Sequence, residues 1–462
     1  MARIQNEAVV EFRSKLRGDV LLPHDPRYDA ARTIWNAMID RKPALIVQCA
    51  GAADVMRSVA FARDHALPVS IKGAGHNIAG NAVCDDGLMI DFSAMRSVHV
   101  NPETRRACVE PGATLADFDH EAQAFGLATP LGINSTTGVA GLTLGGGFGW
   151  LTRKHGMTID NLASADVVTA EGKQVRADAQ TNPDLFWAIR GGGGNFGVVT
   201  QFEFELHPFG PEPLSGLIVY PFEHAKTLLA KYRAFVDASA EDLNVWAVLR
   251  RAPPLPFLPA EVHGKHVVIF PFIYTGDVEA GLKAIEPLRS FGQAHGEHFG
   301  AQPFTAWQKA FDPLLTPGAR NYWKSHNFTE LGDGAIDAIV KYAARLPSPQ
   351  CEIFIGLISG HANHVASDAT AYAHRDTKFV LNVHSRWDKA EDDKACIGWA
   401  REFFDAAVPY ATGGVYVNFL TQDEVDRIPA AYGPNYERLT RLKAKYDPTN
   451  LFRLNQNIKP AA

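Results

Sequence analysis

Glycine is concentrated at three places in the first 200 residues of this 462-residue chain, and one of them also carries a histidine. The first is Gly73-Ala74-Gly75-His76, the second runs from Gly138 to Gly149, and the third from Gly191 to Gly197. Glycine lets the backbone approach a ligand closely, and backbone N–H groups in such loops bind phosphate oxygens. The neutral imidazole of His76 is a competent nucleophile. The pattern predicts a site for a large phosphate-bearing ligand, a dinucleotide above all; tight turns in an α+β sheet are the alternative.

The third cluster also contains the spacing of a nicotinamide-dinucleotide fingerprint. Gly192, Gly194 and Gly197 fit G-x-G-x-x-G, but that fingerprint needs a strand before it and a helix after it. Here a short helix over 184–188 is expected before the glycines and a strand over 198–204 after them. The reversed order disfavours a nicotinamide enzyme.

The elements that hold these loops follow from hydrophobic periodicity and turn residues. Residues 44–49 and 69–71 are predicted strands on either side of a helix, so a β-α-β unit leads into Gly73. A hairpin is predicted over 167–175, and Asn182-Pro183 is expected to cap the helix that follows. After the proline-rich residues 208–213 the pattern changes to strands at 217–220, 245–249 and 267–273, with helices such as 222–236. From Gly413 onward, strands and glycine turns are expected again.

Several of these segments, taken in order, are highly specific for one family. They resemble the berberine-bridge-enzyme-like oxidases of the vanillyl-alcohol-oxidase superfamily, which have a PCMH-type FAD domain. The length and the ending Phe452–Ile458 are most similar to the bacterial branch that includes 6-hydroxy-D-nicotine oxidase. The similarity runs from about Leu45 to Pro460 and is weakest between Pro211 and Pro409. The segments that carry it are Lys72–Asn77, Gly138–Gly149, Asn182–Trp187, Gly193–Val199, Tyr416–Phe419 and Asp447–Phe452.

The resemblance implies an α+β fold in which the FAD-binding domain is split in sequence. Residues 1–208 would form its first part, with the PCMH-type region at about 39–208, and residues 413–462 would complete it. Residues 209–412 would form an inserted α+β substrate domain with an antiparallel sheet flanked by helices.

The same resemblance implies FAD, bound covalently through His76 only. Family members with a second attachment use a cysteine where this chain has Asn134, and no cysteine lies near that position in the sequence. No metal is expected. The cofactor-binding positions would be Lys72, Gly73, Ala74, Gly75, His76, Asn77, Gly80, Gly132, Asn134, Thr136, Thr137, Gly138, Gly141, Leu142, Gly145, Gly146, Gly149, Gly197, Val198, Asn418, Asn455 and Asn457.

Tyr416 and Asn418 are the predicted catalytic residues. If residues 414–419 form a strand, its period of two puts both on one face, and Phe419 on the other. Some relatives have a tyrosine base at the position of Phe419. An alcohol needs a base to take its O–H proton, whereas a neutral amine needs one less strictly, so phenylalanine here weakly favours an amine or electron-rich heterocycle as substrate over a sugar. Tyr416, Tyr322 and His384 are the alternatives for a base.

The expected activity is hydride transfer from a small amine, heterocycle or alcohol to flavin N5, with O₂ reoxidising the flavin to give H₂O₂. A dehydrogenase of the same fold with another acceptor, or a non-catalytic flavin-binding protein, are the alternatives. The net charge of −6 without a basic cluster argues against nucleic acid, and no apolar run approaches a membrane span. Five scattered cysteines and an N-terminus Met1–Glu7 without an apolar core favour a cytoplasmic protein with reduced thiols. A monomer or homodimer is expected.

Overall fold

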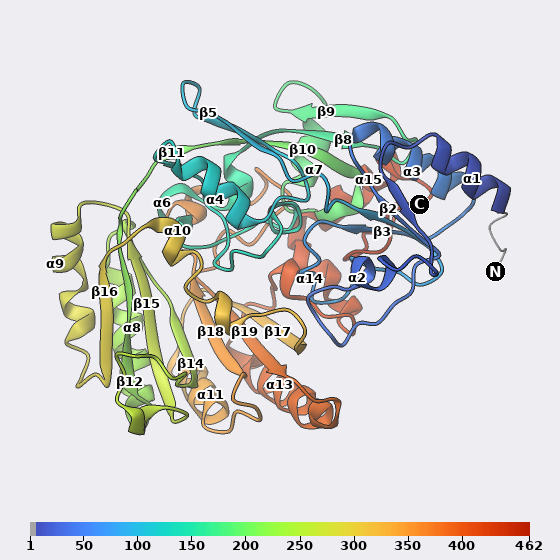
Figure 1. Ribbon diagram of the computed structural model, residues 1–462. Helices are drawn as coiled ribbons and strands as arrows, with labels where there is room; N and C mark the ends of the chain where they lie inside the picture. The colour runs from blue at the N-terminus through green and yellow to red at the C-terminus, as the bar shows by residue number, and fades with distance from the viewer. Residues whose placement is uncertain (1–5) are drawn as a thin grey trace.

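A computed structural model describes residues 6–462 (Figure 1). The N-terminal segment Met1–Glu7, for which no signal peptide is predicted, lies mostly outside these residues. Within residues 6–462 no helix has the length and apolar character needed to span a bilayer. The α-helices are α1 (Asn6–Ser14), α2 (Tyr28–Arg32), α3 (Ala52–Asp64), α4 (Leu115–Gln123), α5 (Val139–Leu144), α6 (Thr152–His155), α7 (Pro183–Ile189), α8 (Ala225–Ala238), α9 (Val278–Arg289), α10 (Phe304–Trp307), α11 (Asp333–Ala343), α12 (His361–His364), α13 (Asp393–Ala407), α14 (Ile428–Tyr432) and α15 (Tyr436–Tyr446).

Three sheets form from the strands between residues 19 and 208. The predicted β-α-β unit is confirmed, but its two strands do not pair: both lie parallel to β4, which separates them. The predicted hairpin is also confirmed, in a five-stranded antiparallel sheet. The four-stranded sheet has the spatial order β1 (Asp19–Leu21), β2 (Leu45–Gln48), β4 (Leu88–Asp91), β3 (Val69–Lys72). The five-stranded sheet has the order β5 (Val98–Asn101), β6 (Arg106–Val109), β10 (Val198–Glu205), β8 (Leu162–Val168), β9 (Gln174–Asp178). The two-stranded sheet pairs β11 (His207–Pro208) with β7 (Leu127–Ala128).

All strands between residues 214 and 387 belong to one antiparallel sheet. The predicted strand over 245–249 is interrupted at Trp246, which separates two short strands. In spatial order the sheet contains β16 (Gly296–Ala301), β12 (Leu214–Pro221), β15 (His266–Tyr274), β14 (Ala247–Arg251), β18 (Glu352–Leu357), β19 (Phe379–Trp387) and β17 (Arg320–Phe328), with β13 (Leu243–Val245) paired to β15.

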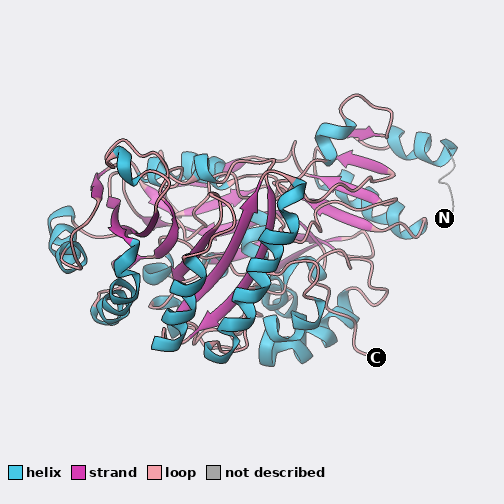
Figure 2. Ribbon diagram, turned by 90° about the horizontal axis from the view of Figure 1, so that it is seen from below, coloured by secondary structure: helices cyan, strands magenta, loops and turns pink. Residues whose placement is uncertain are grey.

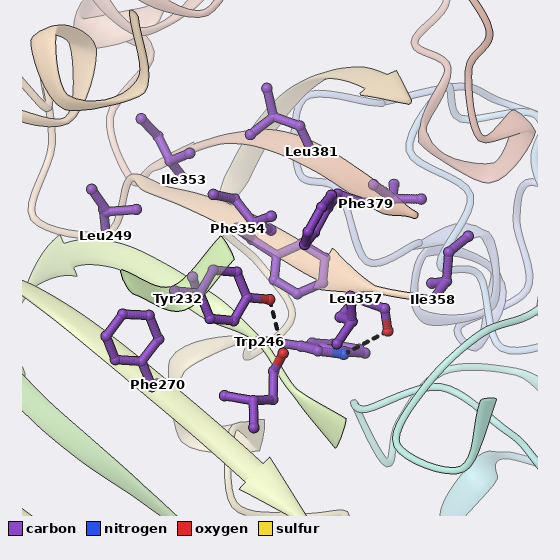
Figure 3. Packing of buried hydrophobic residues seen from close by; sticks show 14 of the residues in the cluster. Tyr232, Trp246, Leu249, Phe270, Ile353, Phe354, Leu357, Ile358, Phe379 and Leu381 are labelled. Atoms are coloured by element: carbon purple, nitrogen blue, oxygen red, sulfur yellow. Dashed lines mark hydrogen bonds between the residues drawn. The ribbon is translucent and has the colours of Figure 1, made fainter. Parts of the chain in front are cut away.

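Helices cover one face of this large sheet, as Figure 2 shows. Because side chains alternate along a strand, one set faces the helices, including Leu249, Phe270, Ile353 and Leu381 (Figure 3). Tyr232 from α8 packs among them and donates its hydroxyl hydrogen bond to the carbonyl of Val245 at 2.8 Å. The other set of side chains faces the part of the molecule built from the first 208 residues.

The C-terminal segment corrects the prediction of strands after Gly413. Residues 413–462 contain α14, α15 and 3-10 turns, and no strand. Helix α15 packs beside α7, where the Tyr446 hydroxyl bonds to Asp184 at 2.7 Å. The segment therefore returns to the first part of the chain (Figure 1), but with helices.

Helix α7 shows one further difference. Asn182 stands at the N-cap position before Pro183, but it adopts a left-handed conformation with φ 48° and makes no side-chain cap. Its amide instead donates to the carbonyl of Arg176 at 2.7 Å.

Candidate active site

One cavity of about 480 Å³ joins the glycine loops, the free face of the large sheet and the C-terminal segment. Its walls therefore come from segments as far apart in the chain as Trp35 and Gln456. The predicted residues that line it are Gly73, Ala74, Gly75, His76, Asn77, Gly132, Asn134, Thr137, Gly138, Gly141, Leu142, Gly145, Gly197, Val198, Tyr416, Asn418 and Asn455.

The first loop follows β3 and carries His76 into the cavity. The imidazole stacks on the indole of Trp35 with ring centroids 5.2 Å apart and an interplanar angle of 20°. Its Nε2 lies 3.0 Å from Oγ1 of Thr136. Burial lowers the pKa of His76 to about 4, so the imidazole is neutral near pH 7.

The first and second glycine loops touch through their backbones. A Cβ atom added to Gly138 would lie 2.9 Å from the backbone N of Ala74, so only glycine permits this approach. Asn134, also in the second loop, accepts hydrogen bonds at Oδ1 from the backbone N–H of Thr136 at 3.0 Å and from its hydroxyl at 2.6 Å. The two loops thus form a continuous wall of exposed backbone and small side chains.

The C-terminal contribution to the site is a 3-10 turn at Val417–Phe419, which corrects the predicted strand. Asn418 donates from Nδ2 to the Tyr416 hydroxyl at 3.0 Å and to the carbonyl of Leu142 at 3.2 Å. Phe419 does not face away: it lines the same cavity and contacts the rings of Phe148 and Trp323. Val415 and Val417 are buried in one core and Tyr416 in another, as in a strand, but the chain turns at Tyr416, where the Phe419 N–H donates to the Tyr416 carbonyl at 2.9 Å. No partner strand lies beside them among the described residues.

The three candidate bases lie in different surroundings. Burial raises the pKa of Tyr416 to about 12, and its oxygen accepts from Asn418 and from the backbone N–H of Gly147. Tyr322 lies on the helical face of the sheet, where its hydroxyl donates to Asp423 at 2.6 Å, so it does not reach the cavity. His384 does line the cavity.

Six predicted cofactor positions do not line the cavity. Lys72 donates its ammonium hydrogen bond to the carbonyl of Ala31, and Gly80 packs against Ile39. Thr136 acts on the site through His76. The remaining three are Gly146, Gly149 and Asn457.

Most residues of the sheet wall were not predicted from the sequence. Strands β14, β18, β19 and β17 align Arg250, Glu352, His384 and Trp323 in one cross-strand row. Glu352 accepts from Arg250 at 2.7 Å through Oε2 and lies 3.2 Å from His384 through Oε1. Burial alone would raise the pKa of Glu352, but the charge of Arg250 and the contact with His384 lower it to about 2. Polar residues at alternate positions of apolar strands were the only signal in the sequence.

The cavity fits the cofactor that the sequence implies. Gly73, Gly138, Gly141 and Gly194 place bare backbone along one side of it. Asn455 lines the cavity, and its Oδ1 atom is buried without a hydrogen-bond partner in residues 6–462. Buried polar atoms without partners are rare unless a ligand or water satisfies them. Backbone N–H groups and amide side chains are suitable groups for a dinucleotide.

Comparison with known proteins identifies the family. Residues 43–178 match the family model described as an FAD binding domain, and residues 415–459 match the one described as berberine and berberine like. The chain is 32% identical over 460 residues to an FAD-linked oxidoreductase of Dictyostelium discoideum, covering 98% of this chain and 97% of the relative. It is 30% identical over 459 residues to (R)-6-hydroxynicotine oxidase of Paenarthrobacter nicotinovorans, covering 96% and 97%.

Solved structures agree with this assignment. The crystal structure of 6-hydroxy-D-nicotine oxidase from Arthrobacter nicotinovorans superimposes with a TM-score of 0.86 at 27% identity, covering 96% of this chain and 98% of the other. Xylooligosaccharide oxidase from Myceliophthora thermophila has the same fold, with a TM-score of 0.85 at 24% identity and coverage of 98% and 100%. The predicted fold class and family are therefore confirmed, and the chain belongs to the berberine-bridge-enzyme-like family of FAD-linked oxidoreductases.

Proposed function

We propose that this protein is an FAD-linked oxidase of a small organic substrate: an amine, a heterocycle or an alcohol. FAD, when bound, would accept a hydride from the substrate and pass the two electrons to O₂, which takes up two protons to give H₂O₂. The observation that carries the proposal is the single cavity in which the glycine loops meet the aromatic face of the large sheet. One half suits a dinucleotide and the other a small, flat molecule. The proposed cofactor-binding residues are those predicted ones that line the cavity.

The proposed domain division follows the same arrangement. Residues 1–208 and 413–462 would form the FAD-binding domain, and residues 209–412 the substrate domain. In support, the strands up to residue 208 form sheets separate from the large sheet, whose strands all lie between 214 and 387. Helix α15 returns to α7.

We further propose a covalent bond between Nδ1 of His76 and the 8α-methyl carbon of FAD. Its formation would remove one hydrogen from the methyl group and one from the imidazole, and the two electrons and two protons would pass to O₂. The Thr136 hydroxyl has one proton, which it donates to Oδ1 of Asn134 at 2.6 Å. Its oxygen must then accept from His76, so Nε2 carries the imidazole proton and Nδ1 keeps its lone pair. Asn134 and Thr136 would therefore act as positioning residues for attachment, although neither forms the bond itself.

A single attachment point is expected. The five free cysteines do not line the cavity, and the amide of Asn134 is a poor nucleophile. Acid precipitation of the holoenzyme should leave the yellow colour in the protein pellet, and His76→Ala should release it. Thr136→Val should slow attachment without removing FAD binding, because it leaves the imidazole tautomer undefined. Mass spectrometry that finds flavin on any peptide without His76 contradicts the assignment.

His384 is the base that the cavity supports best. Burial lowers its pKa, so it is neutral near pH 7. Its Nδ1 lies 3.2 Å from Oε1 of Glu352 and its Nε2 lies 3.4 Å from Oδ1 of Asn321. A substrate N–H or O–H group must therefore take the place of Asn321 at Nε2 before His384 can accept its proton. Tyr322 is unsuitable because it lies on the other face of the sheet.

A reduction screen tests the proposed activity. Amines, alcohols and sugars are added to the holoenzyme without oxygen, and bleaching of the flavin absorbance identifies a substrate. Admission of air should then restore the absorbance rapidly with formation of H₂O₂. Bleaching followed by slow return in air would indicate a dehydrogenase with another acceptor. A flavin that no compound bleaches would contradict an enzymatic function.

A further inference from the structure

Two neighbours determine the orientation of the His76 imidazole. One is the turn at residues 134–137, which is closed by the backbone N–H of Thr137 donating to the carbonyl of Asn134 at 3.1 Å. Thr136 in this turn places its hydroxyl at Nε2 of His76. The other neighbour is Trp35, whose indole stacks on the imidazole. Both must keep their places if His76 is to keep one orientation and one tautomer.

A short 3-10 turn between β16 and β17, Asp312–Leu314, contacts the turn at residues 134–137. Asp312 accepts from the backbone N–H of Ser135 at 2.9 Å through Oδ1, and from the Ser135 hydroxyl through Oδ2. The hydrogen bond of a β-turn joins its first and fourth residues, so the N–H of the second residue needs a partner from outside the turn. Asp312 supplies that partner with two charge-assisted hydrogen bonds.

The same segment also holds Trp35. The carbonyl of Leu315, three residues after Asp312, accepts from Nε1 of Trp35 at 2.9 Å. The backbone N–H of Trp35 in turn donates to the carbonyl of Gly75, beside His76 in the chain, at 3.1 Å. Residues 312–315 therefore contact both neighbours of the imidazole, one through a carboxylate and the other through a backbone carbonyl.

Loss of the Asp312 carboxylate would disturb the turn through Ser135. Ser135 is almost fully buried, so its N–H and hydroxyl would be left without an acceptor at a cost in free energy. Movement of Ser135 relieves that cost. Because Thr136 follows directly in the chain, the same movement takes the Thr136 hydroxyl away from Nε2 of His76.

We propose that Asp312 is a positioning residue for His76: by holding Ser135 it fixes the turn that places the Thr136 hydroxyl at Nε2 and leaves Nδ1 free to bond with FAD. This inference rests on the proposed function, because it concerns attachment at the same imidazole. Asp312 lies between two strands of the large sheet. Attachment therefore depends on the packing of that part of the chain against the glycine loops.

The rate of attachment tests the proposal. FAD is added to the FAD-free full chain, and the flavin that stays with the protein after acid precipitation is measured over time. Asp312→Ala should slow attachment roughly ten- to hundredfold, as expected for lost hydrogen bonds to a charged group, while FAD still binds in a titration. Asp312→Asn should recover most of the rate, because its amide can accept from the Ser135 N–H and donate to the Ser135 hydroxyl. Ser135→Ala is a milder variant that removes only the hydroxyl contact, and it should slow attachment less than Asp312→Ala.

Asp393→Ala is the matched control. Asp393 is also an acidic residue that accepts side-chain hydrogen bonds, from Arg320 and from the indole of Trp387 at 2.7 Å, and none of these three residues lines the cavity. This variant should lower Tm and attach FAD at the wild-type rate. An equally slow attachment in Asp393→Ala would show that reduced stability is the cause, and would overturn the role of Asp312.

The imidazole gives a second measurement that needs no flavin. Ring ¹⁵N spectra of the FAD-free protein, with His76 assigned by comparison with His76→Ala, should show one protonated and one unprotonated nitrogen in the wild type, in Asp312→Asn and in Asp393→Ala. In Asp312→Ala the two signals should move toward each other, because the tautomers mix.

Either a wild-type rate of attachment or unchanged ring signals in Asp312→Ala would overturn the inference. Failure of the proposed function has a different signature. If acid removes all flavin from the wild type, the attachment itself is wrong, whereas the ring signals still decide whether Asp312 fixes His76.

Discussion

Gly145 offers a direct test of the contact between the second glycine loop and the C-terminal turn. A Cβ atom at this position would lie 2.2 Å from Oδ1 of Asn418 and 2.4 Å from its Cγ and Nδ2. The backbone of Gly145, with φ −92°, is accessible to any residue, so Gly145→Ala changes only the space available. The methyl group must displace the Asn418 side chain.

The expected loss can be worked from the contacts that Asn418 makes. Displacement breaks its hydrogen bonds to Leu142 and Tyr416, at about 1 kcal/mol each, and overpacking adds about 1–3 kcal/mol. Gly145→Ala should therefore lose roughly 3–5 kcal/mol of stability. If Asn418 also stabilises charge that develops in the reaction, the rate of anaerobic flavin reduction should fall about 10²–10³-fold.

Melting temperature, flavin spectrum and reduction rate measure these effects. Gly398→Ala is the control, since a Cβ at that position within α13 meets open space, and it should gain up to about 1 kcal/mol. The double variant Gly145→Ala, Asn418→Ala should be no worse than Asn418→Ala alone, because the displaced atoms are gone. Wild-type behaviour of Gly145→Ala, or additive losses in the double variant, would refute the reasoning.

Three further outcomes are expected. Gly141 lies in α5, and a Cβ atom added to it has no protein atom within 4 Å, so Gly141→Ala should stabilise the FAD-free protein by up to about 1 kcal/mol. The same variant should weaken FAD binding in a titration if the cofactor approaches this part of the backbone. Tyr322→Phe should lower stability by about 1–2 kcal/mol, because it removes the hydrogen bond to Asp423, and should leave the rate of flavin reduction unchanged. A large loss of rate would contradict the placement of Tyr322 outside the cavity. Burial lowers the pKa of His326 to about 4, so the unfolded chain takes up a proton at a higher pH than the folded protein does. As the pH falls from 6.5 to 4, the free energy of unfolding should therefore decrease by up to about 1.4 kcal/mol per pH unit. His326→Gln should flatten this part of the denaturation profile, and an unchanged profile would show that other groups cause the slope.

Local sequence rules succeeded where the deciding interactions are local. The β-α-β unit before Gly73, the hairpin after β8 and the strand β10 follow from periodicity and turn residues, and all three are present. The same rules failed at 414–419, where an alternating pattern produced a 3-10 turn. Alternate residues there are buried against two separate cores, as in a strand, but no partner strand lies beside the segment in residues 6–462, and a single chain segment does not reveal that.

The glycine loops that line the cavity were predicted from the sequence, and the residues of its sheet wall largely were not. Glycines mark close backbone approaches by their chemistry alone, so the amino-acid sequence is sufficient to identify Gly73, Gly138 and Gly145. Arg250, Glu352 and His384 carry no such mark. They lie 102 and 32 residues apart and meet only because β14, β18 and β19 are neighbours in a particular register.

The sequence by itself therefore determined the fold class, the family and the glycine loops that line the cavity, because backbone conformation and hydrophobic period depend on residues close in the chain. Only the tertiary structure decided that Asn382, Trp323 and Phe419 face one cavity, that Tyr322 does not, and that Thr136 bonds to His76. These contacts depend on strand register and on packing between distant segments, where a shift of one residue turns a side chain to the opposite face.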